Sequence, residues 1–202
     1  MCVEKIIFIN KPCLKPYMDN QTILIILLII LAWFIFTYNR LITMKNYVKK
    51  SFSGIDVQLK RRTDLIPNLV SVVKGYAKHE KTIMEEVTKA RSHLEEARKR
   101  KDVQKMANTE SELNSAVKSL FAVSENYPDL KANKNFLDLQ KQLRNTEDQI
   151  AASRRIYNEN VTSYNTKIEI FPSNLLAKLF SFKQEKLYET KERESKKILV
   201  NE

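Results

Sequence analysis

The apolar run from Ile23 to Phe36 constrains this chain more than any other feature. Its fourteen residues, ILIILLIILAWFIF, include no polar or charged side chain, and uncharged flanks extend it from Asn20 to Asn39. A helix needs about 20 such residues to cross about 30 Å of hydrocarbon. The sequence therefore predicts one transmembrane helix from Gln21 to Asn39, preceded by a short tail (1–20) and followed by a separate soluble domain.

A cleaved signal peptide is the alternative to a permanent anchor. Such a peptide has an apolar core of about 7–15 residues followed by small residues at the cleavage site. Here large aromatic residues occur instead, and Trp33 and Tyr38 suit an aromatic belt at the membrane interface. The composition favours an uncleaved anchor.

Positive charge is concentrated behind the run, within a formal net charge of +11. Seven cations follow it (Arg40, Lys45, Lys49, Lys50, Lys60, Arg61 and Arg62), against Lys5, Lys11 and Lys15 before it. The positive-inside bias predicts an external N-terminus and a cytoplasmic C-terminal domain. Anionic lipid is the expected partner of these cations. The mixed Glu and Lys residues of the later helices make a nucleic-acid partner the weaker hypothesis.

The sequence carries little that resembles an active site. Both cysteines precede the run, which excludes a disulfide or cysteine-based metal site from the soluble domain. Gly54 and Gly75 are the only glycines, so no phosphate-binding loop can be written. His79 and His93 lie too far apart for a helical zinc-protease motif. We therefore expect neither cofactor nor metal, and a protein that is not an enzyme.

Seven-residue spacing dominates the soluble part and predicts long helices. Apolar residues recur at Leu41, Val48, Ile55 and Leu69, with Arg62 breaking the series, and again from Phe136 to Tyr164. Pro67 lies inside the first series and predicts a kink or a restart of that helix. Scarce glycine and proline agree with an all-α fold.

Helix boundaries follow from caps and lengths. We expect helices over 40–76, 80–99, 102–125 and 133–169, with Asp102 capping the third and a stop at 126–130. A turn at 75–80 keeps the charged residues of the second helix away from the bilayer. The result is an antiparallel four-helix bundle (40–182), continuous with the transmembrane helix and followed by a charged tail (183–202).

Three local features leave alternatives open. Asp56 either contacts Arg61 or Arg62 or is simply exposed, and exposure is the more common outcome for aspartate. The hydroxyls of two core tyrosines, Tyr157 and Tyr164, are expected at the bundle rim. Segment 173–182 (SNLLAKLFSF) is either an amphipathic helix at the membrane interface or a short helix that closes the bundle.

Several stretches together resemble the LemA family of bacterial membrane proteins. They are YNRL at 38–41, IDVQLKRR at 55–62, DLIPNLV at 64–70, KGYAKHE at 74–80, ENYPDLKA at 125–132, YNT at 164–166 and FPSN at 171–174. The resemblance covers about residues 21–190 and departs at Ser181 and at Leu187–Tyr188. It implies one transmembrane helix, a helical bundle and a role in membrane organisation, as in magnetosome membranes, rather than catalysis.

The combined prediction is a scaffold or adaptor that organises partners at the bacterial cytoplasmic (inner) membrane. The alternative is a regulatory or signalling accessory subunit of a membrane protease or sensor system. Expected partners are the lipid bilayer and membrane or cytoplasmic proteins, with a homo-oligomer as a further option. Residues predicted to contact lipid or partners are Lys45, Lys49, Lys50, Arg61, Arg62, Leu175, Leu176, Leu179 and Phe180.

Overall fold

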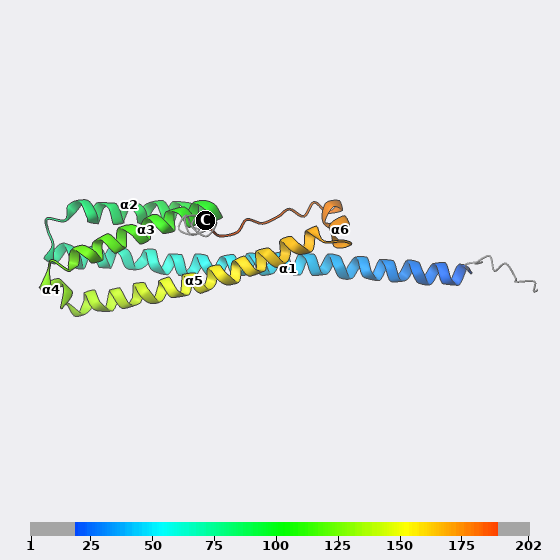
Figure 1. Ribbon diagram of the computed structural model, residues 1–202, viewed down its shortest axis with the longest axis horizontal. Coiled ribbons are helices and arrows are strands. Elements are labelled where there is room, and N and C mark those ends of the chain that lie inside the picture. Colours follow the sequence, from blue (N-terminus) through cyan, green and yellow to red (C-terminus); the bar gives the residue numbers. More distant parts are fainter. Residues whose placement is uncertain (1–18, 190–202) are drawn as a thin grey trace, which may run out of the picture.

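The chain folds into helices, as the sequence predicted, in a computed structural model that describes residues 19–189 (Figure 1). In order they are α1 (Asn20–Tyr76), α2 (Lys81–Arg100), α3 (Val103–Ser124), α4 (Pro128–Lys131), α5 (Lys134–Glu169) and α6 (Ser173–Leu179). No strand occurs within this described part. Residues 1–18 and 190–202, and with them both cysteines, lie outside it.

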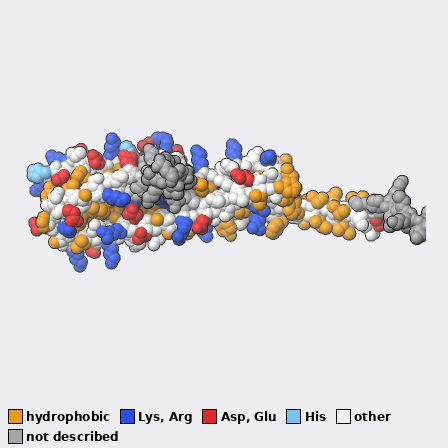
Figure 2. All heavy atoms as spheres, viewed as in Figure 1, with side chains coloured by type: hydrophobic (Ala, Val, Ile, Leu, Met, Phe, Trp, Pro, Cys, Tyr) orange, Lys and Arg blue, Asp and Glu red, His pale blue; other side chains and the backbone are white. Residues whose placement is uncertain are grey.

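Helix α1 carries the apolar run directly into the bundle. Its 57 residues span about 85 Å at 1.5 Å per residue. The N-terminal part of α1, before its contacts with α6, projects beyond the other helices as a rod covered by hydrophobic side chains (Figure 2). Among the described residues it is the one helix long and apolar enough to cross a membrane. The predicted continuity between transmembrane helix and bundle is confirmed.

Pro67 does not interrupt α1, so the predicted restart of the helix at this position does not occur. Proline lacks the N–H that would otherwise bond the carbonyl four residues earlier, at Thr63. Arg91 on α2 supplies a substitute, because its Nε donates to that carbonyl at 2.8 Å. Tertiary packing thus satisfies the acceptor that proline leaves open.

The four long helices pack as two pairs. α1 lies along α5, α2 lies along α3, and α1 also contacts α2 (Figure 1). The turn between α1 and α2 falls at 77–80, as predicted, and Asp102 caps α3 by accepting from the Lys105 N–H. Asn133 caps α5 in the same way. These caps satisfy N–H groups that the first helical turn leaves unpaired.

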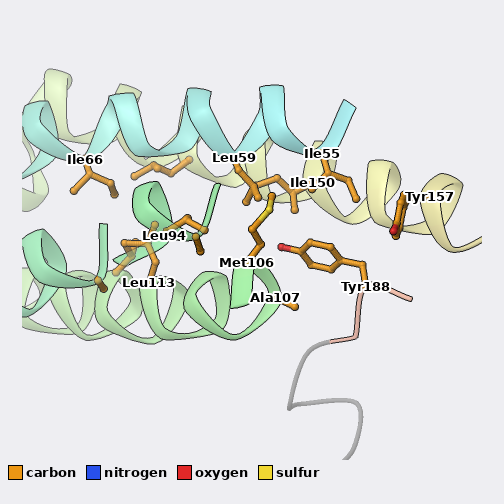
Figure 3. Packing of buried hydrophobic residues seen from close by; sticks show 14 of the residues in the cluster. Ile55, Leu59, Ile66, Leu94, Met106, Ala107, Leu113, Ile150, Tyr157 and Tyr188 are labelled. Carbon is orange, nitrogen blue, oxygen red and sulfur yellow. The ribbon is translucent and has the colours of Figure 1, made fainter. Parts of the chain in front are cut away.

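The predicted seven-residue series form the core. The buried side chains include Leu41, Val48, Ile55, Leu69, Phe136, Leu143, Ile150, Tyr157 and Tyr164. Figure 3 shows Leu59 and Ile66 of α1 facing Leu94 of α2 and Leu113 of α3. Burial of these apolar faces, at about 25 cal/mol per Å², is what holds otherwise separate helices together.

The predicted bundle boundary at 182 leaves out residues 183–189, which pack against the bundle in the structure. They were expected to begin a charged tail, but they run in extended form back along α5 (Figure 1). Tyr188 within them is completely buried. We call residues 183–189 the C-terminal strap, because they close one side of the bundle; the rest of the predicted tail lies outside the described residues.

Candidate functional site

Helix α6 lies where the projecting part of α1 meets the bundle. The Phe180 ring lies 4.8 Å from the Tyr38 ring and 5.9 Å from the Phe34 ring, measured between centroids. The Phe182 ring lies 6.1 Å from Tyr38, and the Lys45 ammonium lies 5.8 Å from the Phe182 ring centre. Offset and edge contacts of this kind favour aromatic pairs. They fix α6 beside the last two turns of the predicted membrane span.

The structure supports the alternative in which segment 173–182 closes the bundle, and a second face of α6 stays exposed. Ser173, Leu176 and Ala177 are buried against the bundle. The opposite face is apolar and exposed, with Leu175 59% and Leu179 69% accessible, and the preceding Phe171 77% accessible. We call these exposed side chains, together with Phe180, the apolar collar; Figure 2 shows hydrophobic atoms gathered where the rod joins the body. Leu176 is therefore not available as a contact residue.

The predicted basic contact residues separate into two groups. Lys49, Lys50 and Arg61 are exposed, and Lys45 is half-buried beside Phe182. Arg62 is only 2% accessible, so the prediction that it contacts lipid or a partner at the surface is corrected. Arg62 is seven residues from Ile55 and from Leu69, and therefore shares their inward-facing phase.

A buried polar cluster connects three elements that are distant in sequence. Glu110 of α3 is 2% accessible and accepts a 2.6 Å hydrogen bond from the Tyr188 hydroxyl. Its other oxygen lies 3.5 Å from Nη1 of Arg154 on α5. The Arg154 guanidinium also lies 5.2 Å from the centre of the Tyr188 ring. In Figure 3 the Tyr188 ring enters the core near Met106 and Ala107.

Burial governs the protonation of this cluster. It raises the pKa of Glu110, an effect that the Tyr188 hydrogen bond and the Arg154 charge oppose. It also raises the pKa of Tyr188, reinforced by the Glu110 charge. Burial lowers the pKa of Arg62, and the charges of Glu147 and Glu110 oppose that change. Arginine nevertheless keeps its proton in proteins, so Arg62 remains charged.

Paired asparagines hold the strap to α5. Asn158 donates to the Tyr188 carbonyl and accepts from the Tyr188 N–H, and Asn165 does the same with Glu185. The asparagines are seven residues apart in a helix, about 10.5 Å, and their partners are three apart in extended chain, about 10 Å. The two spacings match, so one helix face can bind an antiparallel strap at both points.

Two buried tyrosines use the same geometry. Tyr157 donates its hydroxyl proton to the Lys186 carbonyl at 2.9 Å, and Tyr164 donates to the Lys183 carbonyl at 3.1 Å. Their hydroxyls were expected at the rim, but they meet the strap instead. Burial raises the pKa of Tyr157 to about 12, so this donor keeps its proton across the physiological range.

The remaining polar candidates form surface contacts. Asp56 pairs with Arg98 of α2 at 2.8 Å rather than with Arg61 or Arg62. His93 lies 3.2 Å from Glu112, while His79 is exposed. Residues 19–189 hold no group of three metal-ligating side chains. The polar contacts on this part of the chain hold the helices in register.

Comparison with known proteins agrees with this architecture. Protein LemA of Metamycoplasma hominis is 29% identical over 181 aligned residues, covering 81% of this chain and 81% of the relative. Magnetosome protein MamQ 2 of Paramagnetospirillum magneticum is 26% identical over 184 aligned residues, covering 80% of this chain and 68% of the relative. The LemA family model matches residues 51–201, which include the later part of α1, helices α2 to α6 and the strap. The chain therefore belongs to the LemA family.

Proposed function

We propose that this protein is a membrane-anchored scaffold that organises protein partners at the bacterial cytoplasmic membrane without catalysing a reaction. The observation that carries the proposal is the continuity of α1, which enters the bundle with no loop after the membrane span. A flexible linker would let the bundle turn freely. A continuous helix instead gives it a defined direction relative to the bilayer.

The apolar collar would restrict the bundle further. Exposed apolar side chains on a short helix, flanked by lysines, suit the boundary between headgroups and acyl chains. The contacts of Phe180 with Phe34 and Tyr38 support a position of the collar at the level of the proposed span's end. We infer that the collar lies in the interface and that Lys45, Lys49 and Lys50 face anionic headgroups, each contributing about 1 kcal/mol.

Anchoring makes partner recruitment effective. Confining the bundle to the membrane raises its effective concentration toward other membrane proteins without any new contact. The positive residues that follow the span favour a cytoplasmic bundle and an external N-terminus. Similarity to a protein named as a magnetosome protein supports a membrane-associated role.

Site-specific photocrosslinking in cells tests the scaffold proposal. A benzophenone amino acid replaces exposed Arg61 or Lys50 in the full chain, and the matched control carries it at buried Ile66. We expect discrete protein adducts from the exposed positions and none from Ile66. Absence of protein adducts at every exposed position would contradict a scaffold. Adducts confined to one protease or sensor, whose output changes when this protein is deleted, would support the regulatory-subunit alternative instead.

A further inference from the structure

A cavity of about 280 Å³ lies between α3 and α5, midway along the bundle. The backbones of these two helices approach each other less closely than those within the α1–α5 and α2–α3 pairs. Toward the membrane, the strap and Glu110 fill the space between them. Toward the far end, the Phe121 and Phe136 rings meet at 5.8 Å. The cavity is the part of the space between α3 and α5 that side chains leave open.

Arg62 of α1 lines this cavity, and two of its guanidinium nitrogens lack hydrogen-bond partners. The residue is 2% accessible, and its Nε and Nη1 have no hydrogen-bond partner among the described residues. A buried donor without a partner costs about 1–3 kcal/mol, and more when it carries charge. Glu110 and Glu147 attract the guanidinium electrostatically, but they leave those two nitrogens unbonded.

The other lining residues suit a negative ligand. Asn114 and Gln140 are half-buried amides, and the Asn114 Oδ1 also lacks a partner. Lys118 and Arg144 are exposed at the rim, opposite a single lining carboxylate, Glu147. Three cations and one carboxylate leave a positive balance within this described site. Guanidinium, ammonium and amide groups are the donors that carboxylate and phosphate oxygens prefer.

We infer that this cavity binds a small soluble oxyanion, with Arg62 as the principal donor and Lys118 and Arg144 as rim contacts. The volume falls at the lower end for small-molecule pockets, about 300 Å³, so a compact ligand fits better than a nucleotide or cofactor. Arg62 lies roughly 35 Å along α1 from the end of the membrane span. That distance excludes headgroups that remain in the bilayer, and leaves a dissolved carboxylate or phosphate.

Thermal unfolding of the full chain in detergent micelles tests this site, with inorganic phosphate and malonate as probes and sodium chloride at matched ionic strength as the baseline. At least one probe should raise the melting temperature in a saturable manner beyond chloride. Arg62→Gln should raise the half-saturating concentration by about tenfold or more, because a charge-assisted donor is lost. Arg155→Gln, an exposed change of equal charge on α5, should leave it unchanged.

Arg62 is buried, so its replacement can also weaken the fold. The double variant Lys118→Gln/Arg144→Gln alters only exposed rim residues and should weaken binding while folding normally. Absence of a saturable shift with both probes would overturn the inference. An equal response in the wild type, the rim variant and Arg62→Gln would overturn it as well, because the anions would then bind elsewhere.

Discussion

The hydroxyl of Tyr188 donates a 2.6 Å hydrogen bond to Oε2 of Glu110, joining residues 78 positions apart in the chain. Tyr188→Phe removes the donor while leaving the carboxylate buried. An unsatisfied buried acceptor costs about 1–3 kcal/mol, so we expect that loss in the free energy of unfolding. Tyr188→Ala should cost more, about 3–5 kcal/mol, because a fully buried aromatic ring is also removed.

Denaturant unfolding followed by circular dichroism measures both variants. Lys186→Ala is the matched control, because its exposed side chain lies on the same strap and only its carbonyl bonds to α5. Its unfolding free energy should stay within about 0.5 kcal/mol of wild type. If Tyr188→Phe were equally neutral, the strap would contribute packing but no polar stabilisation.

Glu110→Gln should change how stability depends on pH. Burial raises the pKa of Glu110 above its ordinary value of 4.5, so the folded protein binds this proton more tightly than the unfolded chain does. The resulting stabilisation is complete below about 4.5 and is lost as pH rises through the folded pKa. Glutamine does not titrate, so the stability of wild type relative to Glu110→Gln should fall as the pH rises above about 4.5.

Unfolding free energies of the two proteins at several pH values provide the test. Only their difference is interpreted, because other carboxylates titrate equally in both. A difference that grows with pH would mean that the Tyr188 hydrogen bond and the Arg154 charge outweigh burial and lower this pKa.

The paired asparagines should control release of the strap. Asn158→Ala/Asn165→Ala removes four hydrogen bonds between α5 and strap backbone groups. We expect faster tryptic cleavage after Lys183 and Lys186 and lost amide-exchange protection at Glu185 and Tyr188, while helical content is retained. Asn145→Ala, at an exposed position of the same helix, should not change cleavage. Unchanged protection in the double variant would assign the strap's attachment to its tyrosines.

Arg91 and Pro67 should show energetic coupling through the Thr63 carbonyl. Arg91→Met leaves this acceptor without a donor when proline occupies position 67, at a cost of about 1 kcal/mol. In a Pro67→Ala background the helix can supply its own N–H, so the same replacement should cost less. Thermal unfolding of all four proteins gives the coupling energy.

The surface ion pair of Arg91 with Glu95 is the confounding contact in that cycle. Glu95→Gln measures it separately, and exposed pairs at this spacing contribute about 0.2–0.5 kcal/mol. Equal effects of Arg91→Met in both backgrounds would mean that Thr63 does not depend on Arg91.

Regular features of the sequence predicted most of the fold. Three features depend only on nearby residues: the apolar run, the seven-residue series from Phe136 to Tyr164 and the Asp102 cap. The structure contains the helices that these features predict. The restart predicted at Pro67 does not occur. Local propensity alone favours a break there, but a side chain from α2 replaces the hydrogen bond that proline cannot donate. Local rules cannot anticipate a donor that arrives through tertiary packing.

The candidate site was harder to predict because neither the buried Arg62 nor the strap follows these local patterns. Arg62 interrupts an apolar series, and its charge favours a surface position, whereas its phase implies the burial that the structure shows. The strap has neither helical periodicity nor alternation, and its charges resemble those of a tail. The seven-residue spacing of Asn158 and Asn165, on the helix that carries Tyr157 and Tyr164, was the available signal for a second chain segment along α5.

Lipid-carried quenching of tryptophan fluorescence tests the membrane geometry most directly. Trp33 is the only tryptophan in the chain and lies within the predicted span. Full-length protein is reconstituted in vesicles with brominated lipids, as wild type and as Trp33→Phe carrying either Leu179→Trp or Arg61→Trp. We predict strong quenching at position 33, clear quenching at position 179 in the collar, and none at position 61, roughly 33 Å along α1 from the span's end. Position 179 behaving like position 61, or an unquenched Trp33, would contradict a bundle fixed to the bilayer by α1 and α6.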